Sequence, residues 1–184
     1  MRTSCLIILL LITACLTLSF NFFSSKKKRD HEVIANEITA TVVKKLTKKH
    51  QMDLIGEGGG MMGSIYMIGL SFQIRHPLDR AEARERIIDC VEEVLAAFNS
   101  NDEVRPFLKN YPFTPENVQV AIFSVTSDGR EVYDPYIAVV SVDQNHYVTF
   151  RTEEPDKKSY KNKYKEPYSE AVATLKNKSK QLER

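Results

Sequence analysis

The sequence predicts an α+β fold, in which a small antiparallel sheet of about four strands carries two helices packed on one face. An N-terminal membrane-anchor or signal segment precedes this domain. Apolar residues recur at helical spacing after Asp30 and after Asp79, and they alternate with small or polar residues between positions 68 and 75. Consecutive strand-like runs late in the chain favour an antiparallel sheet.

The two helices are defined by their caps and their apolar stripes. Asp30 is suited to cap a helix that runs to about Gln51. Its stripe comprises Ile34, Ile38, Val42 and Leu46. The second helix starts around Asp79, which has the spacing of a capping box with Glu82. Its buried stripe comprises Ile87, Ile88, Val91, Val94, Leu95 and Phe98.

The strongest strand covers residues 64–75, because every second side chain in it is large and apolar. The members of that face are Tyr66, Ile68, Leu70, Phe72 and Ile74. Further strands are expected at residues 52–55, 118–126, 136–142 and 147–151, the last two joined antiparallel by a turn at 143–145. We expect residues 64–75 to pair in one antiparallel sheet with the strands between 118 and 151, and the Tyr66 face to pack beneath the second helix.

The first 23 residues are strongly apolar and allow two interpretations. Residues 12–15, Ile-Thr-Ala-Cys, resemble a bacterial lipobox, in which a signal peptidase cleaves before the cysteine and that cysteine, here Cys15, carries acyl chains. Residues 5–23 also approach the ~20 residues that span a bilayer. The basic run at 26–29 would place the C-terminus of an uncleaved span in the cytoplasm. A lipoprotein would lie in the cell envelope instead.

The expected organisation has four parts. Residues 1–25 are the signal peptide with its lipobox or the transmembrane anchor, and residues 26–29 are a basic juxtamembrane run. Residues 30–153 form the α+β domain. Residues 154–184 form a basic tail rich in lysine and tyrosine, expected to be solvated and partly disordered, with room for a short helix near 169–182. Such a tail is also suited to contact anionic lipid or phosphate backbones.

A glycine-rich run is the most conspicuous motif. Residues 58–63, Gly-Gly-Gly-Met-Met-Gly, match the spacing of a dinucleotide-binding turn, but a strand follows where that motif requires a helix. We therefore interpret residues 56–63 as a flexible connection. Met61 and Met62 within it are suited to form an adaptable apolar contact surface.

No catalytic, cofactor-binding or metal-binding constellation stands out in the sequence. The four histidines, His31, His50, His76 and His146, are not paired at metal-ligand spacing. Cys90 is the only cysteine after the apolar segment and lies at a core position of the second helix. The formal net charge of +2 is too small to define a partner.

These observations favour a membrane-tethered, non-enzymatic interaction domain, consistent with a bacterial cell-envelope lipoprotein. Its partners are membrane lipid, through the anchor, and a protein; nucleic acid is not expected. The alternative is a small hydrolase or transferase with a dispersed active site. A deep polar pocket around His76, His146 or Cys90 would favour that alternative.

Overall fold

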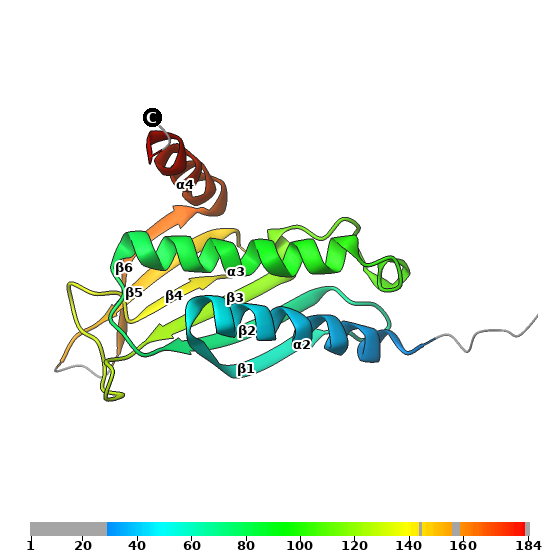
Figure 1. Ribbon diagram of the computed structural model, residues 1–184, viewed down its shortest axis with the longest axis horizontal. Helices are drawn as coiled ribbons and strands as arrows, with labels where there is room; N and C mark the ends of the chain where they lie inside the picture. Colours follow the sequence, from blue (N-terminus) through cyan, green and yellow to red (C-terminus); the bar gives the residue numbers. More distant parts are fainter. Residues whose placement is uncertain (1–28, 144, 156–158, 183–184) are drawn as a thin grey trace, which may run out of the picture.

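The computed structural model describes residues 29–143, 145–155 and 159–182. Figure 1 shows a twisted sheet with helices on one face and a last helix standing out from the body. The elements, in chain order, are α2 (His31–His50), β1 (Met52–Gly60), β2 (Met67–Ile74), α3 (Arg80–Ser100), the 3₁₀ turns η1 (Arg105–Phe107) and η2 (Pro115–Asn117), β3 (Val118–Ser124), β4 (Val139–Val142), β5 (Tyr147–Glu153), β6 (Tyr160–Pro167) and α4 (Tyr168–Leu182).

The α+β class is confirmed, but the sheet differs from the prediction. It has six strands in the order β1-β2-β3-β4-β5-β6, and it is mixed rather than antiparallel. The β2–β3 pair is parallel, and every other neighbouring pair is antiparallel. The reason is the single helix α3 between β2 and β3. It carries the chain back along the sheet, so β3 starts from the same end as β2.

Both predicted helices form with the expected caps. The Asp30 carboxylate accepts a hydrogen bond from the Glu32 backbone N–H at 3.1 Å. Asp79 accepts one from the Glu82 N–H at 2.8 Å, but the Glu82 side chain bonds to His76 and Arg86, so the reciprocal half of the capping box is absent. The predicted stripe of α2 is buried, as is that of α3.

The core lies between the sheet and the two helices. Helix α3 packs on β3 and β4, while α2 packs on β1 and on α3, so β2 runs beneath the region where the helices meet. Phe72 of β2 is fully buried there, and the alternation of buried residues along β2 confirms the predicted strand. Tyr66 is an exception. It precedes the strand, 41% exposed, and its N–H bonds to the Gly60 carbonyl.

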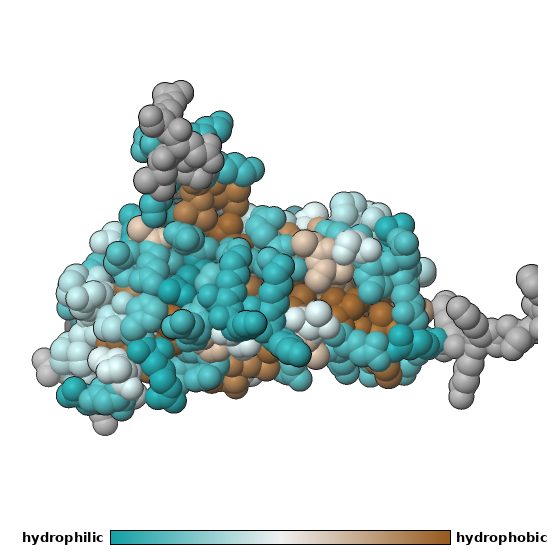
Figure 2. Space-filling view, viewed as in Figure 1, coloured by the Kyte–Doolittle hydropathy of each residue, from teal (hydrophilic) through white to brown (hydrophobic). Residues whose placement is uncertain are grey.

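The sheet continues beyond residue 153. The sequence analysis predicted a solvated tail here, but part of it forms β6, which pairs with β5. The short helix expected near 169–182 forms as α4. Val172 and Leu175 of α4 pack against the core, and Figure 2 shows hydrophobic surface where this helix leaves the body. Tyr168 fixes the base of the helix by donating a hydrogen bond to Glu92 at 2.8 Å.

A buried ion pair joins β6 to α3. Glu166 is almost completely buried and accepts hydrogen bonds from Arg84 at 2.6 Å and from Arg80 at 2.8 Å. The Arg80 guanidinium also lies over the Tyr164 ring, 4.3 Å from its centre. Burial alone would raise the pKa of Glu166, but the hydrogen bonds from Arg84 and Arg80 outweigh it and lower the pKa.

The predicted N-terminal anchor, with Cys15, lies outside the described residues. Among the helices that the structure does describe, none combines the length and the apolar character that a bilayer crossing needs.

Candidate functional site

The glycine-rich run lies in an edge strand of the sheet. Residues 56–60 belong to β1 and pair with β2, so the interpretation of residues 56–63 as a flexible connection is wrong for most of its length. A Cβ at position 59 would lie 2.8 Å from the Met67 carbonyl oxygen, closer than side chains are found. Glycine is therefore required there by the close approach of β2. The sequence pattern predicted the first part of this strand, residues 52–55. It missed residues 56–60, because glycines have no apolar alternation.

The outer edge of β1 has no neighbouring strand in the described sheet. Gly58 and Gly59 are exposed, and Ile55, at a β-bulge, is 51% exposed. The opposite edge, β6, differs in character. Lysines line β6, and Lys161 pairs with Glu154 at 3.1 Å while Lys163 pairs with Asp134. Charged side chains of this kind protect an edge against strand pairing, and the glycines of β1 offer no such protection.

A groove of about 460 Å³ separates this edge from α2. Its α2 wall presents one helical face, because residues 32, 36 and 39 are three to four positions apart. The residues that line it are Glu32, Asn36, Thr39, Glu57, Gly58, Gly59, Met61 and Met62. Glu32 and Glu57 are exposed, and neither carboxylate pairs with a cation among the described residues. The groove is therefore acidic along both walls.

Thr39 in the groove wall has an unusual hydroxyl. The residue is only 8% exposed, and its Oγ1 has no hydrogen-bond partner in the part of the chain that the structure describes. A buried hydroxyl without a partner costs about 1–3 kcal/mol. Thr41, on the same helix, has the usual partner of a helical threonine, because its hydroxyl donates a hydrogen bond to the Glu37 carbonyl at 2.9 Å. The Thr39 hydroxyl therefore lies in the groove wall but is covered from solvent, so a group that enters the groove reaches it only if the wall shifts.

A second hollow of about 460 Å³ lies along the face of the sheet opposite the helices. The strand registers place small residues side by side across it: Gly56, Ser71, Ala121 and Ser141. Glu57, Gly58 and Gly59 border both this hollow and the groove at α2. The glycine segment of β1 is therefore accessible from two sides as well as from its free edge.

Two of the four histidines, His31 and His146, lie in separate local contacts. His31 donates to the Met61 carbonyl at 2.8 Å and stacks on Phe107. His146, in the turn between β4 and β5, pairs with Glu116 at 3.0 Å. Within the described ranges, no group of three or more His, Cys, Asp or Glu side chains is placed to hold a metal ion.

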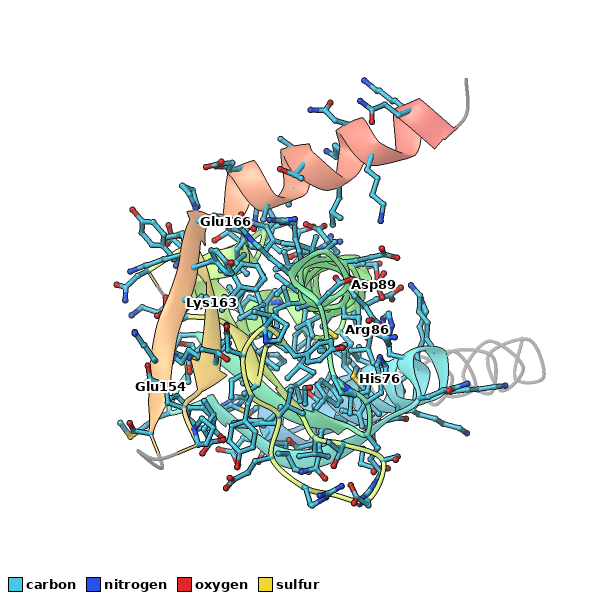
Figure 3. All side chains as sticks on the ribbon, turned by 90° about the vertical axis from the view of Figure 1, so that its left-hand side faces the viewer. His76, Arg86, Asp89, Glu154, Lys163 and Glu166 are labelled. Atoms are coloured by element: carbon cyan, nitrogen blue, oxygen red, sulfur yellow. The ribbon has the colours of Figure 1, made fainter. Side chains whose placement is uncertain are left out.

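The other two histidines belong to a chain of polar contacts along α3, which Figure 3 shows from His76 past Arg86 to Asp89. His76 donates to Glu82 at 2.8 Å, and Arg86 binds Glu82 at 2.6 Å. Arg86 also donates to the His50 carbonyl at 3.0 Å, and His50 donates to Asp89 at 2.6 Å. These contacts fasten the end of α2 to α3.

The carboxylates in this chain titrate as ion-pair members. Hydrogen bonds from His50 and from Lys49 hold the pKa of Asp89 below its usual range, although burial opposes this. Burial would raise the pKa of Glu82, but hydrogen bonds from Arg86 and His76 outweigh it and lower the pKa. A lowered pKa means that the contacts stabilise the charged carboxylate, so both groups are ionised at neutral pH and take part in the ion pairs described above.

Cys90 lies in the core of α3 and is fully buried. Burial raises the pKa of its thiol strongly. A thiol that stays protonated is a poor nucleophile, so the structure places Cys90 in the packing role expected from its spacing. Neither the groove beside α2 nor the hollow along the sheet is lined by His76, His146 or Cys90.

Sequence patterns identified the glycine run and its two methionines but missed Glu32, Thr39 and Glu57. One sequence signal indicated that Thr39 would be buried. It lies four residues after Ala35, on the buried side of α2. Comparisons with protein-family models, with curated proteins and with solved structures found no match to this chain.

Proposed function

We propose that this chain is a membrane-tethered binding module that takes up an extended peptide segment of a partner protein at the free edge of β1. The observation that carries the proposal is the glycine edge strand beside an acidic groove, with the unpartnered Thr39 hydroxyl in its wall. In strand addition, a peptide gains main-chain hydrogen bonds from an exposed edge, and pockets beside the edge select alternate side chains.

The groove defines the chemistry of the preferred peptide. Glu32 and Glu57 supply two carboxylates without partners among the described residues, so they favour a lysine or arginine side chain on the peptide. Thr39 favours a polar side chain or a backbone group within hydrogen-bond reach. Met61 and Met62 close one end of the groove with flexible apolar surface. A basic, extended segment fits these features best.

The binding experiment uses the full chain in detergent micelles and a short capped peptide of alternating lysine and valine. We expect the peptide to slow amide hydrogen exchange in residues 53–59. Charge reversal in the groove, Glu57→Lys, should weaken binding about fivefold or more, because about 1 kcal/mol of favourable pairing becomes repulsion. Glu85→Lys is the matched control, since Glu85 is an exposed carboxylate on α3.

Two results would contradict the binding proposal. One is protection of amides elsewhere but not along β1. The other is equal loss of affinity in Glu57→Lys and Glu85→Lys, which would mean that the peptide responds to net charge rather than to the groove.

The tether is tested separately by the intact mass of protein extracted from membranes. A mass that begins at Cys15 with added acyl groups indicates a lipoprotein, and Cys15→Ala should then accumulate as a larger precursor. A mass that includes residues 1–14 indicates an uncleaved span, which Cys15→Ala leaves unchanged because a span depends on summed hydrophobicity. Recovery of the chain from the soluble fraction would overturn the tethering proposal.

A further inference from the structure

The end of the domain next to the tether carries a cluster of exposed apolar side chains. The described chain begins at Arg29, and the apolar segment of the sequence ends at Phe23. The five residues between them, 24–28, can span at most about 17 Å. This end of the domain is therefore kept close to whatever holds the apolar segment.

Three segments build this end: the start of α2, the loop between β1 and β2, and the loop after α3. They are joined by short contacts, which make one continuous base. His31 of α2 bonds to Met61 and stacks on Phe107 with ring centres 5.6 Å apart. Ile65 exchanges two backbone hydrogen bonds of 2.8 Å with the segment at Phe107 and Lys109. In Figure 1 these segments gather where α2 begins.

The exposed residues of this base have the character of a membrane-interface surface. Met62 is 91% exposed, which makes it the most exposed large apolar residue in the described ranges. Val33, Tyr66 and Tyr111 are each between 41% and 50% exposed. Figure 2 shows hydrophobic patches among the polar surface at this end. Tyrosine is enriched at the level of lipid headgroups because one end of its ring is apolar and the other is polar.

Cations accompany the tyrosines. The Lys109 ammonium lies 5.7 Å from the centre of the Tyr66 ring, and the Arg105 guanidinium lies 4.8 Å from that of Tyr111. Two carboxylates at this end form ion pairs, whereas Glu32 at the start of α2 pairs with no cation among the described residues. Asp102 pairs with Arg105 at 2.7 Å, and Glu103 pairs with Arg29 at 3.2 Å. In the sequence, three lysines at positions 26–28 immediately precede Arg29.

We propose that this base docks on the surface of an anionic bilayer, with Met62 and the tyrosines in the headgroup region. The inference rests on the proposed tethering, because the opposite end of the domain also exposes tyrosines and composition alone does not choose between the ends. Docking at the base would give the domain a fixed orientation. The β1 edge and the groove beside α2 would then start at the membrane surface and extend away from it.

The chain contains no tryptophan, so a single introduced tryptophan reports on its own surroundings. The full chain carrying Met62→Trp is reconstituted in vesicles of phosphatidylcholine and phosphatidylglycerol, with and without brominated acyl chains. We expect its emission to shift to the blue and to be quenched by the brominated lipid. Tyr133→Trp is the matched control, because Tyr133 is a partly exposed tyrosine in the loop after β3, at the far end.

A second pair of variants tests the contact itself. Tyr111→Trp should also be quenched, and adding Met62→Asp should relieve that quenching while the protein stays on the vesicles. If Met62→Trp and Tyr133→Trp are quenched equally little while the protein co-sediments with vesicles, the docking inference fails and the tether stands. If the protein does not associate with vesicles at all, the tethering proposal and the inference both fail.

Discussion

Replacement of Thr39 by valine tests the proposed groove with two effects of opposite sign. The Thr39 side chain is buried, and its hydroxyl lacks a partner among the described residues. Valine has nearly the same shape and a similar helix propensity. A buried hydroxyl without a partner costs about 1–3 kcal/mol. Its removal should therefore stabilise the peptide-free domain by about 1–2 kcal/mol. The same change should weaken binding of the lysine–valine peptide about fivefold, the equivalent of one hydrogen bond of about 1 kcal/mol.

The stability effect is measured by thermal unfolding of the full chain in micelles, followed by far-ultraviolet circular dichroism. For a domain of this size, 1 kcal/mol corresponds to a shift in Tm of about 2–4 °C, so Thr39→Val should raise Tm by a few degrees. Thr41→Val is the control, because the Thr41 hydroxyl already bonds to the Glu37 carbonyl. A lower Tm for Thr39→Val, or peptide affinity equal to that of the unmodified chain, would refute the assignment of this hydroxyl to the binding groove.

Further predictions concern the packing and its pH dependence. Phe72→Ala should cost about 3–5 kcal/mol in urea unfolding, because the ring is fully buried; a negligible change in midpoint would contradict that packing. Glu166→Ala should cost a similar ~3–5 kcal/mol, since it leaves Arg84 buried and unpaired. Asp89 has a lowered pKa, so its ion pair stabilises the fold at neutral pH and is lost as the pH falls through that pKa. Asp89→Asn should therefore be less stable at pH 7, and its deficit in unfolding free energy should shrink as the pH falls below 3.8, the ordinary pKa of the carboxyl. Cys90 should react with iodoacetamide only after denaturation, as mapped by peptide mass spectrometry, because its thiol is buried and protonated.

The proposed orientation at the membrane bears on the binding function. A tethered module is concentrated near its partner if the partner is also at the membrane, which raises the effective concentration without any new contact. Docking of the base would in addition hold the β1 edge at a defined angle. Met62 lies both in the base and at the end of the groove, so a peptide and the bilayer would meet at that residue.

Local patterns in the sequence determined the two core helices and the central strand. The stripes of α2 and α3 and the alternation along β2 arise because each element buries one face. Apolar residues then recur in the sequence with a period of 3.6 residues in a helix and of 2 residues in a strand. The capping residues Asp30 and Asp79 were identifiable because they bond to backbone groups only two or three residues away. The pairing of β2 with β3 was also open to prediction, since a strand, helix and strand in succession favour a parallel crossover, but the later run of strands led to an antiparallel expectation.

Tertiary structure alone decided the two edges of the sheet and the groove. Apolar alternation depends on which face of the sheet is buried, whereas an open edge depends on which strands pair. The alternation pattern therefore could not show that β1 and β6 form the two edges. The groove depends on where the outer face of α2 comes to lie against β1. Atoms of both α2 and β1 determine whether the Thr39 hydroxyl has a hydrogen-bond partner. The spacing of residues in the sequence does not predict this. The sequence alone therefore specifies the elements that bury one face, while the open edge, which carries the proposed function, exists only once the sheet has formed.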